Sequence, residues 1–106
     1  MAISISFKID GKMHTFKKDD IYFSDNIRAV KHTIVQSKFY NSDDPTPEKY
    51  EEMQDDFCEM IADIFNNEFS AEQFKRGLSL SSHEKAEEVF TKALGGKADK
   101  EDKEKK

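Results

Sequence analysis

The chain has 106 residues, of which 36% are hydrophobic and 37% charged, and its formal net charge is −5. This length fits one domain with a modest core, and the acidic balance argues against nucleic acid as the main partner, because phosphate binding needs a clustered basic surface. No apolar run approaches the roughly 20 residues that span a bilayer, and the N-terminus lacks the features of a signal peptide. We therefore expect a soluble, intracellular protein.

The first residues predict a β-hairpin over 2–17. The opening "ISISFKIDGKMHTF" alternates apolar and polar residues, which is the period of a half-buried strand. Asp10-Gly11 favours a two-residue type I′ turn, and such a turn places Ile5 opposite Phe16. An isolated hairpin is only marginally stable in water, so we expect its apolar face to pack on the rest of the protein.

A first helix is predicted at about 25–40. Ser24 or Asp25 can cap its N-terminus, because short polar side chains accept hydrogen bonds from the free amides of the first turn. Apolar residues recur at helical spacing along it and mark the face that we expect to be buried: Ile27, Val30 and Ile34, with Val35 beside them.

The polar "NSDDPTP" predicts the one clear internal loop, and a second helix follows at about 47–66. Thr46 is a suitable N-cap and Pro47 suits the first helical position. Apolar residues then recur at steps of three and four: Tyr50, Met53, Phe57, Met60, Ile61 and Ile64.

A short third helix is predicted at about 71–76. Ser70 can cap it in a capping box with Gln73, while Phe69 and Phe74 occupy the positions of a hydrophobic staple. Gly77 is expected to end this helix in a left-handed conformation.

A fourth helix is predicted at about 82–94. Ser81 and Glu84 have the spacing of a second capping box, and Gly95-Gly96 should end the helix. Its buried positions are expected to be Ala86, Val89, Phe90, Ala93 and Leu94. The sequence thus predicts a mainly α-helical α+β fold in a single domain over 1–96, followed by a charged tail at 97–106 that has too little apolar content to fold.

Nothing in the sequence indicates an enzyme or a metal site. The three histidines, His14, His32 and His83, are scattered and lie at ligand spacing from no other histidine or cysteine. No glycine-rich phosphate loop or nucleophile elbow is present. We expect no catalytic residue and no cofactor.

Two further features favour a structural interpretation. Asp55, Glu59 and Asp63 form a row on the second helix, but carboxylates on one straight helix cannot surround an ion, so we expect a solvated face. Cys58 is the only cysteine and lies in a helical pattern. A buried free thiol is therefore expected there rather than a reactive nucleophile.

The stretch "EEMQDDFCEMIADIFNNEFSAEQFKRGLSLSSHEKAEEVFTKAL" resembles the tail assembly chaperones of long-tailed siphophages, especially those of Gram-positive hosts. The family pattern is an acidic helix that ends in an Ile-Phe-x-Asn-x-Phe-(Thr/Ser) motif, a short helix that closes on Gly-Leu, and a final helix. The N-terminal "FKIDGKMHTFK" is similar to the opening hairpin of the family, whereas the "NSDDPTPEKY" linker is longer and more polar than the family pattern. The matching residues are Ile64, Phe65, Asn67, Phe69, Ser70, Gly77 and Leu78.

The resemblance implies a protein that acts in the host cytoplasm. Such chaperones coat the tape measure protein, keep it soluble, promote tail tube assembly and leave before the virion matures. Many of these phages also make a longer, frameshifted form, which is thought to engage the tail tube protein; this chain resembles the short form. Self-association is a further possibility.

Aromatic and methionine side chains suit an apolar groove with an acidic rim that holds amphipathic helices. Any one of these side chains can equally be core, since a domain of this size must bury most of its aromatic residues. Other classes also stay open: a structural tail or head–tail connector protein retained in the virion, or an intracellular adaptor unrelated to phages. The candidate partner-binding residues are Phe57, Met60, Ile61, Ile64, Phe65, Phe69, Phe74 and Leu78.

Overall fold

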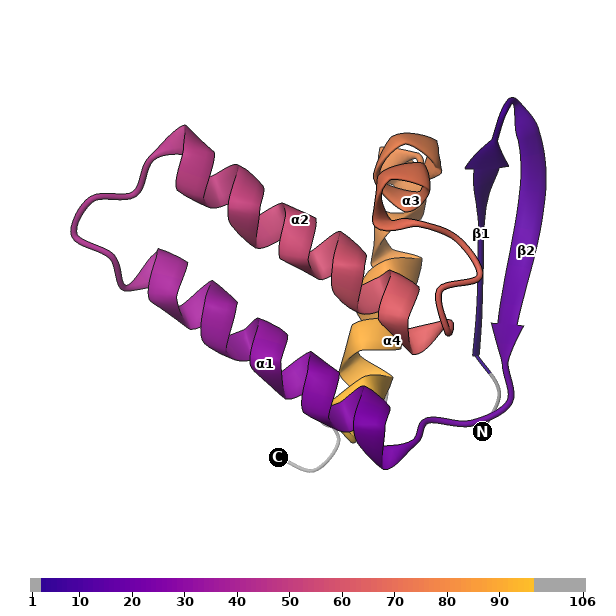
Figure 1. The fold of residues 1–106 in the computed structure, drawn as a ribbon, viewed down its shortest axis with the longest axis horizontal. Coiled ribbons are helices and arrows are strands. Elements are labelled where there is room, and N and C mark those ends of the chain that lie inside the picture. The colour runs from indigo at the N-terminus through magenta and orange to yellow at the C-terminus, as the bar shows by residue number, and fades with distance from the viewer. Residues whose placement is uncertain (1–2, 97–106) are drawn as a thin grey trace.

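The computed structural model describes residues 3–96 and contains a two-stranded sheet and four α-helices (Figure 1). This confirms the predicted α+β, mainly helical fold. The predicted disorder of 97–106 lies outside the described residues. In chain order the elements are β1 (Ile3–Ile9), β2 (Lys12–Lys18), α1 (Phe23–Tyr40), α2 (Pro47–Ile64), α3 (Ala71–Gly77), a 3₁₀ turn η1 (Leu80–Ser82) and α4 (His83–Ala93).

The hairpin has the predicted turn and register. Asp10 and Gly11 have φ angles of 53° and 80°, as a type I′ turn requires. Ile5 pairs with Phe16, and the apolar side chains of β1 point into the protein. On the opposite face, the hydroxyls of Ser6 and Thr15 lie 2.8 Å apart.

Phenylalanine side chains join the hairpin to the start of α3. The ring of Phe7 lies 4.8 Å from the ring of Phe69 and 5.3 Å from that of Phe74, both edge-to-face, an arrangement that aromatic pairs favour. The staple rings Phe69 and Phe74 lie 6.0 Å apart. The predicted capping box is also confirmed, because Ser70 Oγ accepts from the Gln73 amide at 3.0 Å and Gln73 Oε1 accepts from the Ser70 amide at 2.9 Å.

The second helix ends two residues earlier than predicted because the Asn-Asn pair leaves the helical conformation. Asn66 and Asn67 have φ angles of 61° and 58°, a left-handed conformation that asparagine tolerates better than most residues. The Asn67 amide donates to the carbonyl of Ala62 at 2.8 Å, which satisfies one of the free carbonyls of the last turn. At the other end of α2, Thr46 caps the helix as predicted, with Thr46 Oγ1 accepting from the Lys49 amide at 3.2 Å.

The predicted role of Gly77 is wrong, and the structure gives it another. Gly77 does not have a positive φ. Instead, a Cβ atom at this position would lie 1.9 Å from the carbonyl oxygen of Lys8, far inside van der Waals contact. Gly77 is therefore required because it lets the end of α3 approach the backbone of β1.

The start of α4 also differs from the prediction. Ser81 lies inside η1, and neither it nor Ser82 caps the helix with its side chain, so the predicted box with Glu84 does not form. The end agrees with the prediction, since Gly95 has a φ of 91°. Four of the five predicted apolar positions are buried, whereas Leu94 is 37% exposed.

The helices α1 and α2 lie side by side and antiparallel, and their loop end projects away from the rest of the molecule (Figure 1). Their other end packs on α4, which also contacts β1. The core lies at this end: the buried apolar cluster includes Ala29 of α1 and the part of α2 from Phe57 onward. No helix within the described range 3–96 is long and apolar enough to cross a membrane.

Candidate functional site

The structure places the predicted partner-binding residues inside the protein. Seven of the eight are at most 4% exposed and belong to the hydrophobic core, and Leu78 is half-buried against it. In this conformation these side chains hold the domain together, so their contact with a partner stays a prediction. The residues concerned are Phe57, Met60, Ile61, Ile64, Phe65, Phe69, Phe74 and Leu78.

Half of the ten exposed large apolar residues in the described part of the chain lie on α1, where the sequence predicted a buried face. Ile27, Val30 and Ile34 are 47%, 41% and 52% exposed, and Phe23 is 78% exposed. Their spacing of four, three and four residues puts them on one face of the helix. We call these four residues the α1 stripe; it is about 16 Å long at 1.5 Å per residue. The prediction that this face is buried is wrong.

The opposite face of α1 is buried although it carries polar residues. The buried residues of α1 are Asp25, Ala29 and His32, and each polar one has partners. The Asp25 carboxylate lies 3.2 Å from Lys18 Nζ and accepts from the Tyr22 amide at 2.9 Å. This bond also closes the first turn, so α1 begins at Phe23 and not after a Ser24 or Asp25 cap. The polar partners explain why helical periodicity alone chose the wrong face.

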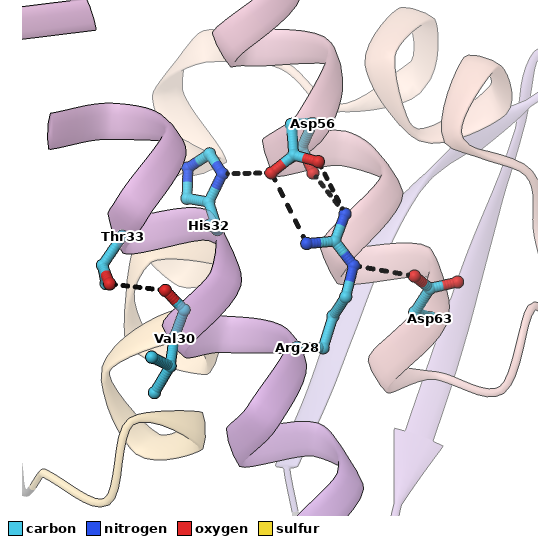
Figure 2. A network of polar contacts seen from close by, with 6 residues as sticks. All are labelled: Arg28, Val30, His32, Thr33, Asp56 and Asp63. Atoms are coloured by element: carbon cyan, nitrogen blue, oxygen red, sulfur yellow. Dashed lines mark hydrogen bonds and ion pairs between the residues drawn. The ribbon is translucent and has the colours of Figure 1, made fainter. Parts of the chain in front are cut away.

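A polar network joins α1 to α2 beneath the stripe (Figure 2). Arg28 donates to Asp56 Oδ1 and to Asp63 Oδ2, both at 2.9 Å. His32 Nδ1 lies 2.8 Å from Asp56 Oδ2, and because an ionised carboxylate only accepts hydrogen bonds, this nitrogen carries the hydrogen. Val30 lies on the other side of α1 from Asp56 in this view. The network fixes which face of α1 meets α2.

The network also changes the acidity of its members. Burial alone would raise the pKa of Asp56, but the hydrogen bonds from Arg28 and His32 lower it below its ordinary value in sum. Burial likewise opposes the charge of Arg28, yet its bonds to Asp56 and Asp63 raise the pKa of the guanidinium. Both groups therefore stay charged at neutral pH.

A groove of about 540 Å³ lies between α1 and α2. From α1 the groove has the apolar side chains of Ile34 and Val35 and the basic ones of Arg28 and Lys31. From α2 it has the carboxylates of Asp56, Glu59 and Asp63, of which Asp56 and Asp63 pair with Arg28. Carboxylates continue along this side of α2 at helical spacing, and α2 as a whole carries seven acidic residues and one lysine, a net charge of −6. Apolar and acidic groups thus meet at the α1–α2 surface. Three of the predicted residues, Phe57, Phe74 and Leu78, line a separate and smaller pocket of about 230 Å³ next to the exposed Leu80.

Two predicted features have no binding geometry of their own. Cys58 is buried, and burial raises the pKa of its thiol to about 11, so it is protonated at neutral pH and a poor nucleophile. The row Asp55, Glu59 and Asp63 is not uniformly solvated, since Asp55 lies 2.8 Å from Lys75 Nζ and Asp63 pairs with Arg28. Among the residues that the structure describes, no cluster of His, Cys, Asp and Glu could hold a metal ion.

A comparison with protein families gives the surface its context. A family model described as phage tail chaperone protein matches the chain over residues 1–106. The chain belongs to the phage tail chaperone family. No curated protein and no solved structure matches it.

Membership of the phage tail chaperone family assigns the protein a role in tail assembly. A tail chaperone acts by binding other tail proteins, so its functional site is a protein-binding surface. The α1 stripe is the described surface that best fits such a role, because contiguous exposed apolar patches on a folded domain mark interaction sites.

Proposed function

We propose that this phage tail chaperone binds the tape measure protein through the α1 stripe, keeps it soluble in the host cytoplasm, and leaves before the virion is complete. The observation that carries the proposal is the orientation of α1, which buries Asp25 and His32 and exposes Phe23 and Ile27. Exposing four large apolar side chains to water does not stabilise the folded state of the free chaperone. A partner that covers them recovers the hydrophobic free energy, about 25 cal/mol per Å² of apolar area removed from water.

The shape and chemistry of the surface fit an amphipathic helix. The stripe has the spacing of a helix face, and docking of helices into apolar grooves uses side chains at three- and four-residue steps on both partners. A helix laid along α1 would contact Ile27 and Ile34 with its apolar face and lie next to the carboxylates of Glu59 and Asp63. The family resemblance implies a long, helical tape measure protein as the partner, and an amphipathic helix of such a rod fits this surface.

Co-expression of the chain with the tape measure protein of its phage tests the proposal. The wild-type chain should keep that protein in the soluble fraction, with many copies bound per tape measure chain, since a domain of about 100 residues covers only a short segment of a long rod. The double variant Ile27→Ser/Ile34→Ser should leave most of the tape measure protein insoluble, although the variant itself stays folded.

The matched control is Lys12→Ser/Lys17→Ser, which replaces two exposed side chains on the hairpin and should behave like wild type. Sedimentation in low and moderate salt completes the test, because an apolar contact survives salt that screens exposed charges. Loss of solubilisation in the control, or full solubilisation by the stripe variant, would contradict the proposed surface.

Departure before maturation separates a chaperone from a structural tail protein. Mass spectrometry of purified virions should detect the tube and tape measure proteins but not this chain. Its presence at a fixed copy number would instead support the alternative of a retained tail or connector subunit.

A further inference from the structure

The outer edge of β1 has unpaired backbone groups. The sheet has two strands, so β1 pairs with β2 along one edge only. Ile9 flanks the two-residue turn opposite Lys12, which makes it a hydrogen-bonded pair, and the pattern alternates along an antiparallel ladder. Ser4, Ser6 and Lys8 therefore direct their N–H and C=O groups away from β2.

This edge is closed at one end and open at the other. The close approach of Gly77 to the Lys8 carbonyl closes it near the turn. Ser4 and Ser6 border a groove of about 350 Å³ between β1 and α4, within the range of about 300–1,000 Å³ found for ligand pockets. Four consecutive residues, Ile3 to Ser6, line the groove. Because consecutive residues alternate between the two faces of a sheet, the groove follows the edge of the strand.

The wall opposite β1 is basic, although the chain as a whole is acidic. Lys85, Glu88 and Lys92 of α4 face the groove, and they follow each other at helical spacing. Neither lysine forms an ion pair with any residue in the described part of the chain. The edge of β1 between Ile3 and Ser6 also lacks the charged or proline residues with which proteins usually block open strands.

We propose that the groove binds an extended, acidic segment of a partner protein, which adds a third strand to the sheet beside β1. Backbone groups of Ser4 and Ser6 form the hydrogen bonds of the new pairing, as in other cases of strand addition. The unpaired ammonium groups of Lys85 and Lys92 bind its carboxylates.

The spacing on α4 defines the acidic pattern of this segment. Lys85 and Lys92 are seven residues apart, about 10 Å along a helix, and four residues of a strand span about 13 Å. The lysine side chains are flexible, so their ammonium groups can adjust to the difference between these two lengths. Two acidic residues four apart therefore face the lysines, and a small neutral residue midway between them faces Glu88. This site is separate from the α1 stripe, which lies on another element of the molecule (Figure 1), so the proposal does not depend on the tape measure protein as partner.

A synthetic peptide, acetyl-Thr-Glu-Val-Ser-Val-Glu-Thr-amide, serves as the probe in an NMR titration of the full ¹⁵N-labelled chain. We expect saturable shifts of the Ser4 and Ser6 amides and slower hydrogen exchange at both. The peptide with both glutamates replaced by glutamine should bind at least tenfold more weakly. A peptide with N-methylated backbone on its edge-facing side should not bind, because it cannot pair with the strand.

Three variants of the protein, one of them a control, separate the contribution of charge to binding from that of the backbone. Lys85→Glu/Lys92→Glu should weaken binding at least tenfold, whereas Lys31→Glu/Lys38→Glu, the same charge change on α1, should weaken it less than twofold. Ser6→Pro removes one edge-facing amide and should abolish the peptide-induced shift of the remaining Ser4 amide. Circular dichroism establishes that each variant is folded, and if Ser6→Pro unfolds, the N-methylated peptide replaces it.

The proposal would be overturned if the peptide shifted amides elsewhere but not those of Ser4 and Ser6. Equal affinity for the glutamate and glutamine peptides would also overturn it. So would the absence of any shift at millimolar peptide. The chain could also dimerise through this edge as its concentration rises. If Ser6→Pro abolishes the dimer but leaves peptide binding unchanged, the edge binds a second copy of this chain and not the peptide.

Discussion

Gly77 shows how one residue sets the distance between two elements. Its hydrogen lies where any other side chain would collide with the Lys8 carbonyl at 1.9 Å. That carbonyl belongs to the backbone of β1 and cannot turn aside as a flexible side chain can. The contact between α3 and the hairpin therefore depends on the absence of a Cβ atom.

Gly77→Ala should cost about 3 kcal/mol of unfolding free energy, the upper part of the range for overpacking. Gly96→Ala is the control, because a Cβ there meets the Thr91 side chain at 3.3 Å and should change stability by less than about 0.5 kcal/mol. Chemical denaturation of both variants measures the difference. Equal stability of the two would mean that α3 and β1 are not packed this closely in solution.

Asp56 makes the contact between α1 and α2 sensitive to acid. Its pKa is lowered in the folded state, so its contribution to stability is present above the ordinary carboxyl pKa of about 3.9 and is lost as pH falls through the lower, folded value. We expect Asp56→Asn to be less stable than wild type at pH 6, and the difference to shrink between pH 4 and pH 2. Urea unfolding across this range measures it. The other carboxylates titrate in both proteins and therefore do not affect the comparison. A difference in unfolding free energy between wild type and variant that does not change with pH would contradict the role given to Asp56.

At the scale of elements, the junction from α2 to α3 is where five of the nine phenylalanine side chains meet. Asn66 and Asn67 end α2, and the box of Ser70 and Gln73 begins α3 only a few residues later. Phe69 lies in this turn and its ring contacts Phe7, Phe65 and other phenylalanines. One side chain thereby ties the turn to the hairpin and to α2.

Phe69→Ala should cost about 3–4 kcal/mol and lower the melting temperature by more than about 10 °C. Phe23→Ala is the matched control: the same side chain is removed from a position that is 78% exposed, so the melting temperature should hardly change. The control should instead weaken tape measure binding. A similar loss of stability in both variants would mean that the α1 stripe is covered in the free protein.

Several local sequence signals predicted the structure correctly, although the local signal for a capping box at Ser81 and Glu84 did not. The turn at Asp10-Gly11, the cap at Thr46 and the box at Ser70 depend on residues a few positions apart, and all three formed. The face of α1 was predicted wrongly because it depends on Asp56, which is 24 residues from His32 along the chain. A helix face with polar residues is usually solvated, and only the fold shows that these polar residues have partners.

The same reason limited the prediction of which apolar residues are exposed and could form a site. Periodicity identified apolar residues on both α1 and α2 but could not decide which set is core. Burial assigns Phe57 and Ile61 to the core and leaves Ile27 and Ile34 outside. The role of Gly77 was missed because no local pattern reports a contact with a strand almost 70 residues earlier.

At the scale of the whole molecule, the buried cluster occupies one end only. Beyond His32 on α1 and before Met53 on α2 no described residue is buried, and the loop end carries the partly exposed aromatic residues Phe39, Tyr40 and Tyr50. Stability should therefore fall towards this end, since local opening is easiest where few apolar contacts are buried.

Native-state hydrogen exchange tests this gradient. Amides of α2 from Phe57 to Ile64 should exchange only through global unfolding, whereas those of the last turn of α1 and of Tyr50 to Glu52 in α2 should exchange by local opening that costs a few kcal/mol less. Uniform protection along α2 would show that the projecting end is as stable as the core.

The charges are also unevenly distributed, and this has a kinetic consequence. The hairpin, residues 3–18, carries four lysines and one aspartate, a net charge of +3, while α2 carries −6. The molecule is therefore an electric dipole as well as an anion. Such a dipole is turned by the field of a charged partner before the two surfaces touch, which raises the rate of productive encounters at low ionic strength. Added salt should then slow the association of a basic helix with the α1–α2 side while leaving the lifetime of the finished apolar contact almost unchanged.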